Sequence, residues 1–397
     1  MPSSPIFNEF EDYFQRLEDA FDLTILNFEI LPSGYNRVYK LKTDKGTKAL
    51  KISEKFKRKE HTLFEHGFLK SLIEYGFDIV PAPLQIYNPD SLDEVVGDTI
   101  AVIDNRLYSI FNWLDGNGYD GSFMHLFGAG VNLANYHQVA ASILENRLQA
   151  GKTDYQSIRS EWGDITARFP PIGAANAQNQ NFSEDLWSAH IKRTYKPKIY
   201  RAPSVFYNQA LQNQASPVDK LIIDCVDFVD RKIEEVRISL FKLGFRCNET
   251  ENGLLYYFPL PKAIAHSDYA PQNIKFDGNK VNVMLDFDNA NARERAYDIA
   301  WALATFCAND DQSLNYSKIS SFLDGYLKIS KLSSDEIAVL PYEIYTRCIE
   351  TMYWPAEKYY SGKPYRLDYA LKDYAIIRWL DTNEKELTKF ICRVAQK

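Results

Sequence analysis

The sequence predicts an α+β protein of two lobes: a small N-terminal lobe with an antiparallel sheet and one main helix, then a larger helix-rich lobe. Three observations predict this. Residues 38–52 form a strand-turn-strand pattern, residues 60–76 repeat apolar side chains at helical spacing, and beyond residue 116 the period is mainly helical. The 397 residues suit two or three packed lobes.

The first lobe is expected at residues 1–109. Residues 38–43 and 47–52 alternate in polarity around the turn Asp44-Lys45-Gly46, which indicates a hairpin. From Glu60 to Gly76 apolar residues recur every three or four positions, and Gly76 stands where a helix would end. Residues 99–113 indicate a further hairpin that turns at Asp104-Asn105.

A helix-rich lobe is expected at residues 117–397, after a hinge at 110–116. Two stretches interrupt its helical period: an insertion near 150–215, rich in Asn, Gln, Pro and Tyr, and residues 254–290, where short strands bracket a turn-rich loop. The predicted catalytic loop is the part of the second stretch at 263–290. The expected helices are 126–148, 217–243, 317–329, 335–353 and 368–394.

Composition narrows the possible functions. The net charge of −7 opposes binding to nucleic acid, and no apolar run is long enough to cross a bilayer. The N-terminus lacks the basic and apolar regions of a secretory signal, so we expect a cytoplasmic protein. We expect it to be a monomer or a homodimer. Five scattered cysteines indicate buried thiols. Basic residues at 42–59 indicate a solvated surface, with Lys51 as the exception.

The residues from His266 to Asp286 carry the chemistry. Asn273 and Asp286 flank a hairpin that turns at 277–279, so their side chains can converge. A carboxamide and a carboxylate offer oxygen ligands that suit Mg²⁺ held against nucleotide phosphates. Asp268, on the preceding loop, is placed to accept the proton of an attacking hydroxyl. The alternative is that His266 is a core histidine and the acids are ordinary turn residues.

The pattern His266-x-Asp268-x-x-x-x-Asn273, with Asp286 thirteen residues further on, resembles the aminoglycoside phosphotransferase, choline kinase and homoserine kinase-like superfamily. The resemblance implies a protein-kinase-like fold and the cofactors Mg²⁺ and ATP, with GTP not excluded. It also implies that Asp268 is the catalytic base, that Asn273 and Asp286 bind Mg²⁺, and that His266 braces the loop. Asp288 stays open between a metal contact, a supporting group and a turn residue.

The first lobe adds nucleotide-binding candidates. Ser33, Gly34 and Asn36 lie in a stretch that resembles the short nucleotide loop of the superfamily. Lys51 stands on a predicted strand, as the kinase lysine that contacts ATP phosphates would. Glu65 on the next helix matches the glutamate that pairs with this lysine, and Glu60 is the competing choice.

The hinge completes the predicted nucleotide site. Phe111 and Trp113 belong to the 110–116 segment, against whose backbone adenine would bind. An ordinary linker between lobes is the alternative. Residues 126–137, after the hinge, resemble the helix that follows the hinge in the superfamily. We assign packing, and no chemistry, to His137.

The acceptor is expected to be a small molecule with a hydroxyl group: an amino sugar, a sugar, an amino alcohol or a homoserine-like amino acid. Only eleven residues separate Asp286 from Asp298, which matches the structural aspartate of the superfamily, so no long peptide-docking segment is present. An atypical Ser/Thr protein kinase and a silent nucleotide-binding scaffold are the alternatives. A stripe at 343–354 either contacts the acceptor or packs in the core.

Overall fold

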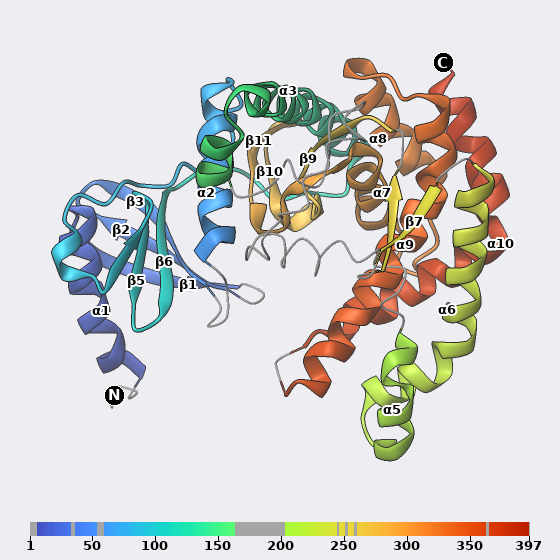
Figure 1. The fold of residues 1–397 in the computed structure, drawn as a ribbon, viewed down its shortest axis with the longest axis horizontal. Helices are drawn as coiled ribbons and strands as arrows, with labels where there is room; N and C mark the ends of the chain where they lie inside the picture. The colour runs from blue at the N-terminus through green and yellow to red at the C-terminus, as the bar shows by residue number, and fades with distance from the viewer. Residues whose placement is uncertain are drawn as a thin grey trace. The chain divides into compact units, whose positions relative to one another are not determined.

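The computed structural model describes residues 6–32, 36–53, 59–162, 203–243, 246–250, 253–257, 260–362 and 365–396 (Figure 1). The chain divides into two compact units. The first comprises residues 1–117, 145–177 and 282–288, and the second comprises residues 118–144, 178–281 and 289–397.

Six strands of the first unit form one sheet in the order β1-β2-β3-β6-β5-β4, with every neighbouring pair antiparallel. Gly46, at φ +85°, closes the β2–β3 hairpin, and Asp104 and Asn105, at φ +48° and +58°, close the β5–β6 hairpin. Both turns lie where the sequence predicts them. The strands are β1 (Ile25–Leu31), β2 (Arg37–Thr43), β3 (Gly46–Ile52), β4 (Glu94–Val96), β5 (Ile100–Ile103) and β6 (Arg106–Asn112).

Two helices accompany this sheet, where the sequence predicted one main helix. The expected one is α2 (Lys59–Glu74). The additional helix α1 (Ile6–Phe21) buries Leu17 and Phe21 against the sheet, in a core that includes Leu41 and Leu50. Figure 1 shows α1 against the strands. Its apolar residues recur at helical spacing, so the signal was present in the sequence.

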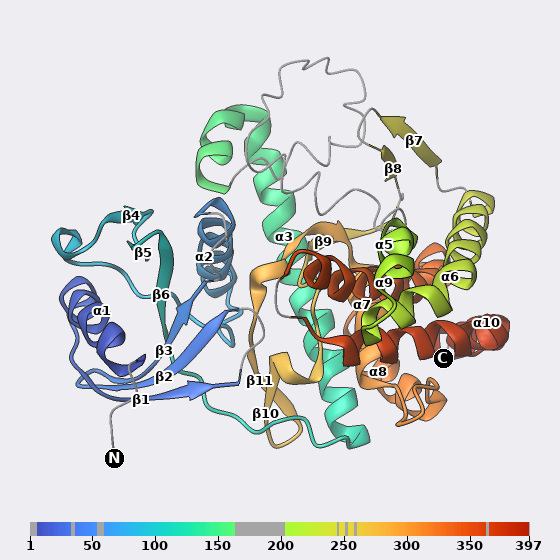
Figure 2. The same ribbon diagram turned by 90° about the horizontal axis from the view of Figure 1, so that it is seen from below.

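Helices make up most of the second unit. Their bounds agree with the prediction at α6 (Pro217–Lys242), α8 (Tyr316–Ile329) and α10 (Leu367–Ala395). The structure adds η4 (Pro203–Phe206) and α5 (Tyr207–Asn213) within the predicted insertion, of which residues 163–202 lie outside the described residues. Figure 2 shows α9 and α10 together with α6 beside them.

Two helices are longer than predicted. The helix α3 (Phe123–Trp162) was expected to end at residue 148, but it continues past Gly151. The helix α9 (Ser334–Tyr360) was expected to end at residue 353, just before Pro355. A proline inside a helix removes a backbone hydrogen bond. Because Pro355 is buried between packed helices, the packing offsets that loss and the helix continues.

Short strands carry the predicted catalytic loop. The strand β9 (Lys262–Ala265) pairs antiparallel with β12 (Asn291–Glu294), which immediately precedes α7 (Arg295–Phe306). Between them lie the 3₁₀ turn η5 (Pro271–Asn273), the strands β10 (Ile274–Asp277) and β11 (Lys280–Met284), and the 3₁₀ turn η6 (Phe287–Asn289). A further hairpin, β7 (Arg246–Thr250) with β8 (Gly253–Tyr257), precedes β9.

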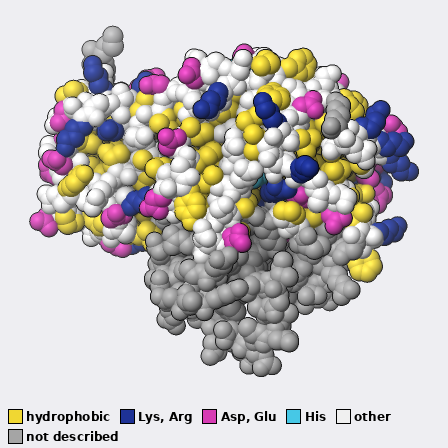
Figure 3. All heavy atoms as spheres, turned by 90° about the horizontal axis from the view of Figure 1, so that it is seen from above, with side chains coloured by type: hydrophobic (Ala, Val, Ile, Leu, Met, Phe, Trp, Pro, Cys, Tyr) yellow, Lys and Arg dark blue, Asp and Glu magenta, His cyan; other side chains and the backbone are white. Residues whose placement is uncertain are grey.

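The surface mixes charges of both signs. On the face shown in Figure 3, the basic and acidic side chains of the described residues are interspersed and form no large patch of one sign. Among the helices in the described part of the chain, none is apolar over a length that could span a bilayer.

Candidate active site

Lys51 is the centre of an ion cluster in the first unit. Its Nζ lies 2.8 Å from Oε1 and 3.1 Å from Oε2 of Glu65, and it also pairs with Oδ1 of Asp288. The side chains of Lys51, Glu65 and Asp288 are 12%, 5% and 18% exposed, so water screens the cluster weakly. On α2, Glu65 and not the competing Glu60 therefore makes the ion pair with Lys51.

The cluster keeps the lysine charged. Burial lowers the pKa of Lys51, but the nearby carboxylates of Asp288, Glu65 and Asp286 raise it more, so the net shift is upward. Asp286 has φ +65°, in the left-handed region that residues other than glycine seldom adopt. Such backbone conformations are concentrated at functional sites, where the surrounding structure maintains them.

Asp288 also has a second partner. Asn36, just before β2, donates from Nδ2 to Asp288 Oδ2 at 2.6 Å. The sequence left the role of Asp288 open, and the structure places its carboxylate between the amine of Lys51 and the amide of Asn36. Of the three predicted nucleotide-loop residues, Asn36 thus belongs to this cluster, whereas Ser33 and Gly34 lie outside the described residues.

The hinge candidates lie at the end of β6. Phe111 is 5% exposed, and its ring meets His66 edge-on at 5.2 Å, so its side chain belongs to the core. The indole N–H of Trp113 donates to Asp115 at 2.7 Å, and the amine of Lys40 lies 4.5 Å from the ring centre. A nucleotide contact at Phe111 would therefore use the backbone, and both assignments stay predictions.

In the second unit, the catalytic loop joins Asp268 to Asn273. The Nδ2 amide of Asn273 donates to the backbone oxygen of Asp268 at 2.9 Å and to its carboxylate Oδ2 at 3.1 Å. Asn273 is 6% exposed, whereas Asp268 is partly exposed. The amide therefore fixes the orientation of a carboxylate that remains accessible to solvent.

A buried carboxylate binds the backbone of this loop. Asp298, at the start of α7, is fully buried and accepts the backbone N–H groups of His266 and Ser267, each at 2.7 Å. Burial raises the pKa of Asp298, but His137, His266 and these hydrogen bonds lower it more, so the pKa lies below its usual value. Ser267, at φ +63°, has the strained conformation that this grip maintains.

Two histidines complete the support. His266 is fully buried, and its Nδ1 accepts the backbone N–H of Asp268 at 3.2 Å, which is consistent with the predicted bracing role. His137 was assigned only packing, but its Nε2 lies 3.1 Å from Asp298 and its Nδ1 lies 2.8 Å from the hydroxyl of Tyr326. Burial lowers the pKa of His137, so the neutral ring donates to the carboxylate and accepts from the tyrosine.

The predicted metal ligands have suitable chemistry. Nδ2 of Asn273 donates to Asp268, so the carboxamide oxygen is the atom of this side chain that could bind a metal ion. Asp286 supplies a carboxylate that already acts on the charge of Lys51. Mg²⁺ usually takes one or two such oxygens together with substrate phosphates, so each of these two residues offers a donor of a kind that the ion accepts.

The three charged residues of the stripe on α9 are buried, whereas Tyr353 and Trp354 are half-buried. Arg347 pairs with Asp373 and lies 4.6 Å from the ring centre of Trp301, and Glu350 accepts from the hydroxyl of Tyr297 at 3.0 Å. Burial raises the pKa of Glu343 to about 7. Glu343, Arg347 and Glu350 are thus part of the interior, as the packing alternative expected, and their relation to an acceptor stays open.

Comparisons with known proteins find similarity in the segment that contains the catalytic loop. Residues 241–332, which include the loop, match the model of a phosphotransferase enzyme family. A homoserine kinase of Afipia carboxidovorans is 40% identical over 82 residues, which make up 21% of this chain. The predicted superfamily resemblance is confirmed. The chain spans about a quarter of the length of the curated homoserine kinases that it matches.

Two solved structures show the fold over nearly the whole chain. An amicoumacin kinase in complex with AMP-PNP and Ca²⁺ superposes with a TM-score of 0.55 at 13% identity, over 96% of this chain and 93% of that one. A spectinomycin phosphotransferase in complex with ADP and spectinomycin gives a TM-score of 0.56 at 11% identity, over 98% of both chains. The fold is therefore the two-lobed, protein-kinase-like α+β fold that the sequence predicted.

Proposed function

We propose that this chain is an ATP-dependent phosphotransferase that phosphorylates a hydroxyl group of a small molecule. In this proposal Asp268 is the base, Asn273 and Asp286 bind Mg²⁺, and Lys51 contacts the phosphates of ATP. The observation that carries the proposal is the hydrogen-bonded pair Asp268–Asn273, supported by buried Asp298 on the segment that matches the phosphotransferase family.

The nucleotide end of the proposal rests on the charge of Lys51. The amine is kept protonated by Glu65, Asp288 and Asp286, so it can contact phosphate oxygens throughout the neutral pH range. Transfer of a phosphoryl group depends mainly on positioning and on neutralising charge. Bound Mg²⁺ would supply the rest of that neutralisation, with Asn273 and Asp286 as its protein ligands.

The transfer end rests on Asp268. Its carboxylate is partly exposed while Asn273 and the loop backbone hold it in place, as a base needs in order to meet an incoming hydroxyl. The proton of the hydroxyl passes to the carboxylate while the oxygen attacks the γ-phosphorus and ADP leaves. Asp268 thus accepts one proton in each turnover.

A small acceptor is favoured by the short link to Asp298. The eleven residues after Asp286 are occupied by η6, β12 and the start of α7, which leaves no room for a long peptide-docking segment. We propose amino sugars, sugars, amino alcohols and homoserine-like amino acids as the possible acceptors, and ATP in preference to GTP as the donor. We also propose that the protein is a cytoplasmic monomer or homodimer that binds neither nucleic acid nor membranes.

The test is an ADP-release screen with Mg·ATP against hydroxyl metabolites and aminoglycosides. Wild type, Asp268→Asn and the control Asp277→Asn, an exposed acid at the end of β10, are compared on each acceptor. We expect at least one acceptor to give ADP release that falls by about 10² or more in Asp268→Asn and is unchanged in Asp277→Asn.

The same screen separates the alternatives. If wild type and Asp268→Asn release ADP equally on every small acceptor, the proposal is wrong. Transfer to a mixed peptide library but to no small molecule would indicate a protein kinase. Thermal stabilisation by Mg·ATP without any transfer would indicate a nucleotide-binding scaffold.

A further inference from the structure

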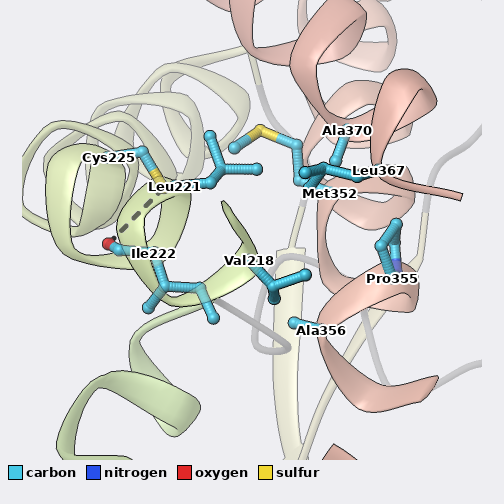
Figure 4. A pocket seen from close by; sticks show the side chains of 9 residues that line it. All are labelled: Val218, Leu221, Ile222, Cys225, Met352, Pro355, Ala356, Leu367 and Ala370. Carbon is cyan, nitrogen blue, oxygen red and sulfur yellow. Dashed lines mark hydrogen bonds between the residues drawn. The ribbon is translucent and has the colours of Figure 1, made fainter. Parts of the chain in front are cut away.

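Two cavities lie between the helices α6, α9 and α10 in the second unit, and they differ in character. The first is lined by apolar side chains that include Leu221, Met352 and Leu367, and Figure 4 shows that they point toward one another. Its free volume is about 10 Å³, roughly the space of one water molecule. This cavity is a packing gap in the core.

The second cavity is larger and polar. It has a volume of about 290 Å³, close to the lower end of the roughly 300–1,000 Å³ typical of small-molecule sites. Glu235 and Lys242 of α6, Tyr345 of α9 and Glu384 of α10 are among the residues that line it. None of them belongs to the catalytic loop or to the Lys51 cluster.

Tyr345, which lines this cavity, carries a buried polar group. Its side chain is 1% exposed, yet its hydroxyl is buried and has no hydrogen-bond partner among the described residues. A buried hydroxyl without a partner costs free energy, which is why most such groups in folded proteins are paired. A ligand with an acceptor or donor at this position would remove that cost.

Charged groups of both signs surround the same cavity. Lys232, which is 7% exposed, pairs with Glu235 and with Asp381, and its Nζ lies 5.8 Å from the ring centre of Tyr345. Glu384 accepts the hydroxyl of Tyr342 at 3.2 Å. The cavity is therefore lined by two lysines, Lys232 and Lys242, and by two glutamates, Glu235 and Glu384.

This lining selects against most classes of ligand. An apolar ligand would desolvate the charged groups that line the cavity and would leave the Tyr345 hydroxyl without a partner. A simple anion or cation would match one pair of charges and oppose the other. A small molecule with no net charge but with both signs complements the lining best.

We propose that the cavity between α6, α9 and α10 binds a small zwitterion of the α-amino acid class. The ammonium group lies toward Glu384 and Glu235, the carboxylate lies toward Lys242 and Lys232, and the hydroxyl of Tyr345 bonds the ligand. This site is separate from phosphoryl transfer and does not depend on the proposed activity.

The experiment measures thermal stabilisation of the full chain by each of the twenty proteinogenic amino acids at millimolar concentration. The best ligand is then titrated calorimetrically. Two analogues accompany it: the corresponding amino alcohol, which lacks the carboxylate, and the corresponding carboxylic acid, which lacks the ammonium. We expect at least one amino acid to raise the melting temperature, and both analogues to bind about tenfold or more weakly.

Four variants locate the binding. Glu384→Gln and Tyr345→Phe should each weaken the affinity about tenfold, and Glu384→Gln tests the site even if Tyr345→Phe folds poorly. The controls are Glu386→Gln and Tyr369→Phe, both on α10 and outside the cavity lining, and they should leave the affinity unchanged.

A fifth variant, Asp268→Asn, separates this site from an acceptor site, because it should retain amino-acid binding whether or not the chain transfers phosphate. Binding lost in Asp268→Asn but kept in Glu384→Gln would place the amino acid at the catalytic loop and overturn the proposal. The absence of stabilisation by any of the twenty amino acids would also overturn it.

Discussion

In the first unit, charged side chains surround Lys51. In the second unit, hydrogen bonds hold the loop of Asp268, and two of them end on the buried carboxylate of Asp298. The amine of Lys51 has two carboxylate partners and a third acid nearby. The Asp268 loop is held by amides and by Asp298, which is fully buried.

The difference teaches how each region can respond to a ligand. Ion pairs to a flexible lysine can be exchanged for phosphate oxygens with little change of backbone, so the first region is suited to binding. Hydrogen bonds to two successive backbone N–H groups fix the loop itself, so the second region is suited to positioning. Substitutions should therefore affect nucleotide affinity in the first region and stability or rate in the second.

The largest effect on stability is expected for Asp298→Ala. The change leaves the N–H groups of His266 and Ser267 and the ring of His137 buried without their acceptor. Breaking a buried charged network of this kind costs about 3–5 kcal/mol. Chemical denaturation should show a loss of this size, and little loss for Asp324→Ala, an exposed acid on α8. Equal stability of the two variants would contradict the supporting role of Asp298.

An intermediate effect is expected for Glu65→Gln. Lys51 keeps Asp288 as a partner but loses the carboxylate that holds it from α2, so the KM for ATP should rise about tenfold with little change in melting temperature. Glu60→Gln, on the same helix and without this ion pair, is the matched control. Equal KM values for the two variants would show that the Lys51–Glu65 pair does not position the lysine.

The smallest effect is expected from the pH dependence of His137. Its pKa is lower in the folded chain than the ordinary 6.5, so below about pH 6.5 the unfolded state binds the proton first and stability falls as the pH falls. One such group contributes at most about 1.4 kcal/mol per pH unit. The slope of unfolding free energy between pH 6.5 and 5 should be shallower in His137→Gln. An unchanged slope would mean that His137 does not titrate in this way.

The sequence predicted what local pattern can carry. The hairpin turns at Gly46 and Asp104-Asn105 follow from spacing and turn residues along the chain. Asp268 and Asn273 lie five residues apart on one loop, so their proximity also has a local origin. The pair Lys51–Glu65 was instead expected from the resemblance to the superfamily, with Glu60 as the competing choice. The chemical roles of these residues stay predictions.

Other features have no local signal. Asp288 meets Lys51 across 237 positions, and His137 meets Asp298 across 161, so neither contact follows from the residues around it. The helix predicted at 335–353 is too short, because α9 continues through Pro355 to Tyr360, where packing against neighbouring helices outweighs the local preference of proline. The helix α1 is different, because its apolar residues recur at helical spacing and so carry a local signal.

The most direct test of the central claim compares nucleotide binding and phosphoryl transfer in Asp268→Asn under single-turnover conditions. If Asp268 positions and deprotonates the acceptor while Lys51 binds the nucleotide, Asp268→Asn should bind Mg·ATP with wild-type affinity and transfer phosphate about 10²–10⁴ times more slowly. Lys51→Met should instead lose affinity for Mg·ATP. Transfer by Asp268→Asn at the wild-type rate would contradict the account.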